Sequence, residues 1–111
     1  MANFFRNTIS NDIGTTPVKV LEVPGNARAT VIGMSLTNLT LGAILVSVEV
    51  ELPGNPVTRG YYCKDILVPA NTSLRLVNGG EKLILTNSNK LYISSNADAS
   101  VDALVSYVEI V

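Results

Sequence analysis

The sequence predicts an all-β fold: an antiparallel β-sandwich, or a jelly-roll-like variant of it, with eight or nine short strands. In Ile44–Leu52, valines recur at every second position with serine or glutamate between them. This is the pattern of a strand with one buried and one solvent-facing side. Clusters of Pro, Gly, Asn and Ser interrupt such segments about every ten residues, as turns do. A strand with one apolar face needs neighbours in a sheet and a second layer over that face.

Length and charge limit the classes of protein. The 111 residues make one domain, 1–111, which is large enough to bury a core. Charged residues are 15% of the chain, below the usual share of about a quarter, so much of the surface is neutral and suited to contact with other proteins. A net charge of -1 gives no electrostatic attraction to nucleic acid or to an anionic membrane. We expect neither as a partner.

The N-terminal region has two interpretations. MANFFRNTIS lacks the continuous apolar core of a secretory signal, so we expect a protein made in a cytoplasm. Phe4–Ser10 alternates, which is compatible with a first strand or with a separable N-terminal arm of residues 1–11. Pro17–Val23 alternates again and ends at the turn Pro24-Gly25-Asn26.

The next strand is expected at Arg28–Asn38, with Ile32, Met34 and Leu36 on one face. Gly33 in the middle of this strand predicts a bulge or the close approach of another backbone. Asn38–Gly42 is expected to form the turn into the valine strand.

The second half of the chain is expected to hold the remaining strands. The valine strand ends at Pro53-Gly54-Asn55-Pro56, because prolines cannot continue a ladder of hydrogen bonds. Gly79-Gly80 lacks the following lysine of a phosphate-binding loop and is interpreted as a turn. The last strand carries apolar residues on both faces, which predicts a central position in a sheet. The strands expected here are Val57–Val68, Ser73–Val77, Glu81–Thr86, Lys90–Ser95 and Val101–Val111.

Few residues offer chemistry. Histidine is absent, which removes the commonest general base and the commonest metal ligand. Cys63, the one cysteine, stands in an apolar strand, where a thiol usually packs as a small hydrophobe. Glu49 and Glu51 share a strand face and are interpreted as its wet side rather than as an acid pair. We therefore expect no enzyme activity, no catalytic residue, no cofactor and no metal site.

Two short motifs are interpreted as chance matches. Asn96–Ser100 resembles the start of a calcium-binding loop, but Val101 and Tyr107 stand where that loop needs glycine and glutamate. The residues at Asn38 and at Asn71 fit the N-glycosylation pattern. A chain rich in Asn and Thr produces this pattern by chance.

The aromatic pairs are the candidate contacts with other proteins. Adjacent side chains of a strand point to opposite faces, so each pair should send one ring into the core and leave one for an interface or a rim. The candidate interface residues are Phe4, Phe5, Arg6, Tyr61 and Tyr62.

Four segments read together resemble small all-β virion proteins of tailed bacteriophages. They are NDIGTTPVKVLEVPGNARATVIGMSLTN, YYCKDILVPANTSLRLVNGGEKLIL, NKLYISS and SVDALVSYVEIV, and they span nearly the whole chain. The resemblance implies a non-enzymatic virion component made in the host cytoplasm. It implies a capsid decoration, or cement, protein that bridges and stabilises major capsid subunits as a homo-oligomer, with a trimer favoured. In that role the N-terminal arm would add a strand to a neighbour's sheet edge.

Two alternatives stay open. A tail, baseplate or fibre-associated module belongs to the same class of virion protein. A carbohydrate-binding β-sandwich belongs to a different class, whose sugar-binding faces usually present several exposed aromatic rings. This chain has no Trp, four Tyr and two Phe, which favours the virion proteins.

Overall fold

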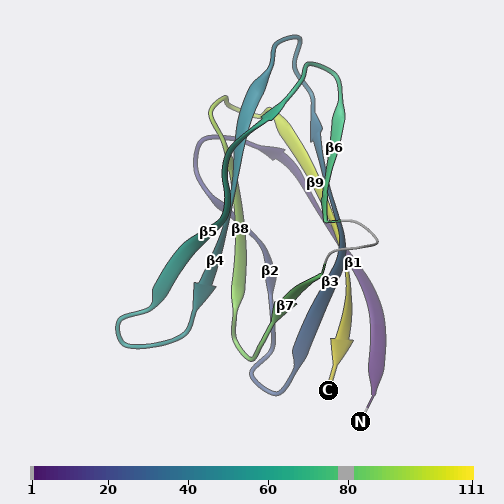
Figure 1. The fold of residues 1–111 in the computed structure, drawn as a ribbon, viewed down its shortest axis with the longest axis vertical. Helices are drawn as coiled ribbons and strands as arrows, with labels where there is room; N and C mark the ends of the chain where they lie inside the picture. Colours follow the sequence, from purple (N-terminus) through teal and green to yellow (C-terminus); the bar gives the residue numbers. More distant parts are fainter. Residues whose placement is uncertain (1, 78–81) are drawn as a thin grey trace.

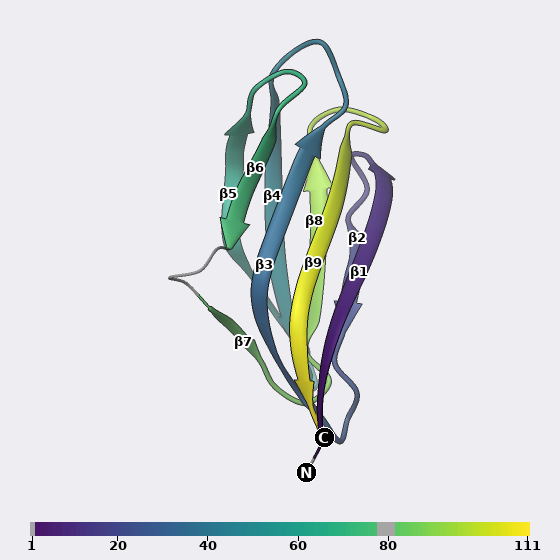
Figure 2. The same cartoon turned by 90° about the vertical axis from the view of Figure 1, so that its right-hand side faces the viewer.

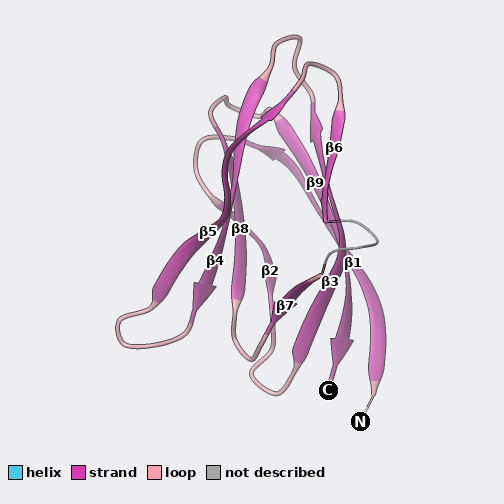
Figure 3. Ribbon diagram, in the orientation of Figure 1, coloured by secondary structure: helices cyan, strands magenta, loops and turns pink. Residues whose placement is uncertain are grey.

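The computed structural model describes residues 2–77 and 82–111. This part contains nine strands and no helix (Figure 1; Figure 3), which confirms the all-β prediction. The Gly79-Gly80 turn and the start of the strand expected at Glu81–Thr86 lie outside the described residues. The strands are β1 (Asn3–Ile13), β2 (Val18–Glu22), β3 (Arg28–Asn38), β4 (Ile44–Leu52), β5 (Thr58–Val68), β6 (Ser73–Val77), β7 (Leu83–Leu85), β8 (Lys90–Ser95) and β9 (Val101–Ile110).

The strand pairings nest like those of one long hairpin. β1 pairs with β9, β2 with β8, β3 with both β6 and β7, and β4 with β5, all antiparallel. Two further pairings, β3 with β9 and β4 with β8, roll this hairpin into two sheets. The five-stranded sheet has the order β1-β9-β3-β6, with β7 also on β3, and the four-stranded sheet has the order β2-β8-β4-β5. This is a jelly-roll arrangement, and Figure 2 shows the five-stranded sheet in front of the four-stranded one.

The core lies between the two sheets and is built from the alternating residues. The apolar side expected of β4 is buried at Val46 and Val48, but Leu52 at its end is exposed. Figure 1 shows the reason, since the β4–β5 hairpin diverges from the five-stranded sheet towards its tip. The second layer therefore no longer covers the apolar side of the hairpin there. Ser47, on the side of β4 expected to face water, is buried and accepts a hydrogen bond from the backbone N–H of Asp65 at 3.0 Å. Completely buried apolar side chains of the core include Leu36, Val46, Val48, Ile93 and Val105.

β3 changes phase at a bulge. Its pairing with β9 shifts register between Val31 and Gly33, so the bulge predicted at Gly33 is confirmed. Val31 and Met34 are both buried, while Ile32 is 40% exposed. The prediction that Ile32 shares a face with Met34 and Leu36 is therefore wrong, because the extra residue reverses the alternation.

β1 is an edge strand of the five-stranded sheet. Asn3–Ser10 pairs residue by residue with β9, and the register shifts only before Ile13. Residues 3–11 form a strand in this structure, because β9 offers an edge that β1 completes. Met1 lies outside the described residues. β9 lies between β1 and β3, which confirms the central position expected for the last strand.

A buried asparagine joins two connections. Asn38, at the end of β3, donates its Nδ2 to the carbonyl oxygens of Gly42, Val68 and Pro69 at 2.9, 3.0 and 3.1 Å. Its Oδ1 accepts hydrogen bonds from the backbone N–H and the hydroxyl of Thr40, both at 2.8 Å. One side chain thus ties the β3–β4 connection to the β5–β6 connection. A side chain buried in this way is inconsistent with glycosylation at Asn38.

Replacing this asparagine should destabilise the fold. Asn38→Ala removes the amide donor from the carbonyl oxygens of Val68 and Pro69, while that of Gly42 keeps the hydroxyl of Thr40 at 2.8 Å, and we expect the free energy of unfolding to fall by about 2–4 kcal/mol. Urea denaturation followed by circular dichroism measures this loss. Asn87→Ala is the control, because it removes one exposed hydrogen bond, to the carbonyl oxygen of Gly25, and should cost less than about 1 kcal/mol. Equal losses would contradict the role given to Asn38.

Candidate interaction surfaces

The aromatic residues of β1 face opposite ways. Phe5 is exposed on the outer side of the five-stranded sheet. Phe4 lies on the inner side, opposite Glu109 of β9, and the guanidinium of Arg6 lies 5.0 Å from the centre of its ring. Arg6 in turn binds Glu109, with 2.9 Å between Nε and Oε1. The expectation that one ring of this pair enters the core is wrong, because the inner side of β1 is polar and open at this end.

Tyr61 and Tyr62 of β5 divide as expected. Tyr61 is exposed and lies opposite Glu49, and the ammonium group of Lys64 lies 5.5 Å from the centre of its ring. Tyr62 is half-buried and packs against the core. Both rings border an open hollow of about 320 Å³ near the tip of the β4–β5 hairpin. Its other lining residues are Val50, Leu52, Thr58 and Gly60.

The structure does not bring the two aromatic pairs together. β1 is the terminal strand of the five-stranded sheet, and β5 is the terminal strand of the four-stranded sheet. Figure 1 and Figure 2 both place the two strands on opposite sides of the sandwich. The five predicted interface residues therefore form two separate candidate contact points.

The outer face of the five-stranded sheet carries large apolar side chains. The most exposed are Phe5 (81%), Ile9 (66%), Ile84 (65%), Ile32 (40%) and Leu104 (40%), and we call this set the apolar outer face. The register of β1 and β9 places Ile9 beside Leu104. Between β3, β6 and β9 the face is hollowed by a pocket of about 280 Å³, whose lining includes Ile32, Leu104 and Arg75. Ile9, Leu104 and Ile32 are thus neighbours, while Val108 and Thr30 lie between Phe5 and Ile84. Groups of exposed apolar side chains mark contact surfaces in soluble proteins.

Sequence reasoning identified one member of this face, Phe5. It missed Ile9, Ile84 and Leu104, because an apolar residue in a strand looks the same whether its face is covered or open. An indication of this face in the sequence is that Val101–Val111 carries apolar residues on both of its sides. A central strand explains that signal, and so does a strand with an exposed contact face.

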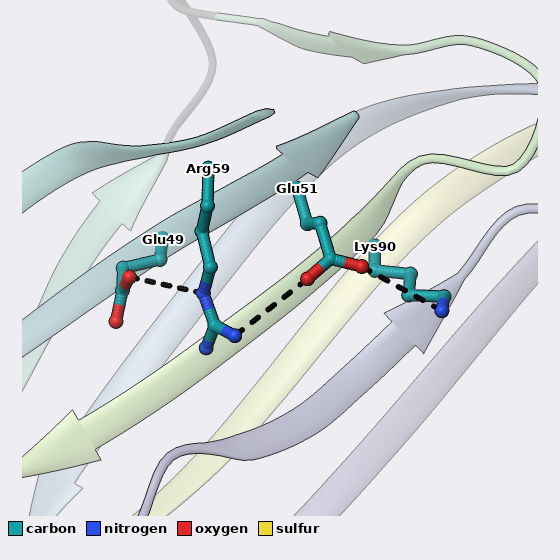
Figure 4. A network of polar contacts seen from close by, with 4 residues as sticks. All are labelled: Glu49, Glu51, Arg59 and Lys90. Carbon is teal, nitrogen blue, oxygen red and sulfur yellow. Dashed lines mark hydrogen bonds and ion pairs between the residues drawn. The ribbon is translucent and has the colours of Figure 1, made fainter. Parts of the chain in front are cut away.

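The outer face of the four-stranded sheet carries charges that pair with one another, beside two exposed side chains of β5, Tyr61 (56%) and Leu67 (58%). Nε of Arg59 lies 3.0 Å from Oε2 of Glu49, and its Nη1 lies 3.6 Å from Oε1 of Glu51. Nζ of Lys90 lies 3.6 Å from the other oxygen of Glu51 (Figure 4). Arg59 also lies over the ring of Tyr92, 3.8 Å from its centre. The carboxylates of Glu49 and Glu51 are thus joined through Arg59, on the outer side of β4.

The remaining reactive groups of the sequence lie apart. Cys63 is half-buried opposite Val48 of β4, and burial raises the pKa of its thiol, which leaves less of the nucleophilic thiolate near neutral pH. Asp98, in the β8–β9 connection, accepts a hydrogen bond from the hydroxyl of Thr15 at 3.4 Å. Within residues 2–77 and 82–111, no three His, Cys, Asp or Glu side chains gather to hold a metal ion. The same residues include no helix long and apolar enough to span a membrane.

Comparison with known proteins identifies the fold. No family model and no curated protein matches the chain. Among solved structures, it is similar to a protein of the T13 particle of infectious bursal disease virus (TM-score 0.62, 9% identity) and to one from the Gt strain of that virus (TM-score 0.55, 11% identity). It is also similar to a protein of Bacillus endospore appendages, which form disulfide-linked pili (TM-score 0.51, 12% identity).

The matches differ in how much of each neighbour they include. They cover 98%, 98% and 97% of this chain, which spans 31% and 33% of the two viral chains and 87% of the pilus chain. This chain is therefore about a third as long as the viral proteins that it resembles in fold. At such low identities the likeness shows the fold alone.

Proposed function

We propose that this chain is a non-enzymatic structural protein of a virion, and that it acts as a capsid decoration protein that bridges and stabilises major capsid subunits. The apolar outer face carries this proposal. Large apolar side chains are unfavourable in water, and soluble monomers rarely expose them in contiguous groups. A protein partner that covers Phe5, Ile84 and Leu104 removes this apolar surface from water.

The two outer faces of the sandwich differ in a way that orients the chain on a particle. On the four-stranded sheet, Glu49, Glu51, Arg59 and Lys90 pair with one another, and such a face is well hydrated without a partner. On the five-stranded sheet five large apolar side chains are exposed, beside the exposed polar side chains of Asn7 and Arg75. In the proposed role the five-stranded sheet lies against the capsid, and the four-stranded sheet faces the solvent.

The fold agrees with this role by analogy. Jelly rolls occur in viral capsid and lectin domains, and two of the structural neighbours are proteins of a virus particle. A fold hosts many functions, so the proposal depends on the exposed face rather than on the likeness. The partners in this role are the major capsid protein or other virion proteins, and further copies of the chain in the trimer that the sequence resemblance implies. The proposed location is the virion.

Counting copies in purified particles tests the proposed location. Quantitative mass spectrometry should find the chain in numbers comparable with the major capsid protein, because a decoration protein occupies repeated capsid positions. A handful of copies per particle would contradict decoration and indicate a tail, baseplate or fibre module. Complete absence from particles, together with binding to a glycan array, would indicate the carbohydrate-binding alternative.

A charge on the apolar outer face should weaken attachment to particles. Ile84→Lys places an ammonium group in a contact that is otherwise apolar, which is costly to bury, and we expect at least about a tenfold loss of affinity for particles stripped of the chain. Co-sedimentation with such particles measures it. The control is Glu22→Lys, which changes the net charge by more than Ile84→Lys does. Glu22 lies on β2 of the other sheet, so this variant should bind particles as the unmodified chain does. Equal losses for both variants would contradict the proposed orientation.

A further inference from the structure

The free edge of β1 is long and regular. β1 is the terminal strand of its sheet (Figure 2), and from Asn3 to Ser10 it keeps an unbroken register with β9. Natural edge strands usually carry a charged side chain, a proline or a bulge that prevents pairing with another chain, and the one charge here, that of Arg6, is paired with Glu109 of the same chain. These eight residues include no lysine and no proline. The backbone N–H and C=O groups on this side of β1 are therefore open to another strand.

The other terminal strands are interrupted or short. β5 shifts its register against β4 twice, and Asp65 within it has a φ of 50°. β2 has five residues and a register shift between Lys19 and Leu21. β6 and β7 are two short strands that share one side of β3. Of the described edges, that of β1 is the best suited to pairing.

The sequence of β1 is complementary to itself in the antiparallel direction. Pairing centred on Asn7 places Asn7 of one copy opposite Asn7 of the other, and it places Phe5 opposite Ile9 twice. Phe5 and Ile9 are both exposed on the outer side of the sheet, by 81% and 66%. Cross-strand pairs of an aromatic and a β-branched side chain stabilise antiparallel sheets.

The charges of β1 permit the same pairing. The one charged side chain between Asn3 and Ser10 is Arg6, and it is already bound to Glu109 of its own copy. A register centred on Asn7 sets Arg6 opposite Thr8 of the other copy, so the two arginines do not face each other. Self-pairing therefore brings no like charges into direct opposition.

We propose that two copies of this chain pair along their β1 strands, antiparallel and centred on Asn7, and so join their five-stranded sheets into one continuous sheet. The contact is isologous, with the same surface on both copies. A specific interface buries at least about 1,000 Å² in total. The Phe5–Ile9 pairs bury the facing sides of these side chains, the backbone edges and flanking side chains supply the rest of the contact, and the tops of both side chains stay on the apolar outer face.

This contact does not require the proposed virion role, but it is compatible with it. The two-fold axis is perpendicular to the joined sheet, so the apolar outer faces of both copies point to the same side. A dimer would present a doubled apolar face to one partner surface. The dimer would either be the complete assembly or connect two chains that belong to neighbouring oligomers.

Disulfide trapping tests the register. In a Cys63→Ala background, Asn7→Cys should cross-link to its counterpart under mild oxidation, because opposed residues of an antiparallel pair have Cα atoms about 4.5–5.5 Å apart. Asn3→Cys is the matched control, since the proposed register sets the two copies of position 3 roughly 25 Å apart. Non-reducing gels measure the dimer fraction. No cross-link at position 7, or equal cross-linking at both positions, would overturn the proposal.

A charge on the paired edge should weaken self-association. Ile9→Lys removes one side of both apolar pairs, and we expect dimer formation measured by sedimentation equilibrium to weaken at least about tenfold, with an unchanged circular dichroism spectrum. The control is Leu67→Lys, because Leu67 is similarly exposed, at 58%, on the terminal strand of the other sheet. It should associate like the unmodified chain.

A monomer at every concentration of the unmodified chain, or equal weakening by both variants, would overturn the contact. Both experiments use the purified chain without particles. Their failure is therefore distinguishable from the failure of the virion role, which the copy number in particles decides.

Discussion

The burial of one apolar side of each strand against a second layer is the constraint on which this structure depends. Val48 of β4 and Val105 of β9 belong to different sheets, and both are completely buried. Either sheet without the other would expose its apolar side to water. The nested pairings bring the two layers together while keeping neighbouring strands antiparallel. The sheet edges and the outer faces are what remains for contact with other molecules.

Alternation and turn residues are sufficient to place the strands but not to pair them. The limits expected for Ile44–Leu52 and Arg28–Asn38 agree with β4 and β3, because turn residues that cannot continue a ladder bound each segment. The partners of a strand depend on residues far away in the chain, which a local pattern does not record. Gly33 signals a bulge, but the reversed exposure of Ile32 follows only from the register with β9.

The candidate contacts were partly visible in the sequence for a similar reason. Adjacent aromatic residues draw attention, and Phe5 and Tyr61 are indeed exposed. Isolated aliphatic residues such as Ile9 do not, because their environment depends on what lies over that side of the sheet. An alternating N-terminal segment is likewise the same whether it forms a free arm or a strand. In this structure the segment is a strand on the edge of β9, and that edge is a property of the folded chain.

The bulge in β3 also limits how the length of this chain can vary. Ala29 before the bulge and Met34 and Leu36 after it all face the core, and they do so only because an extra residue stands between them. If the same residues formed a regular ladder without the bulge, Ser35 would turn inward and Leu36 outward in half of the strand. Related chains can therefore differ in the length of the 53–57 loop with little effect on the core, whereas between Ala29 and Leu36 the residue count and the bulge must change together: one residue fewer requires a regular strand.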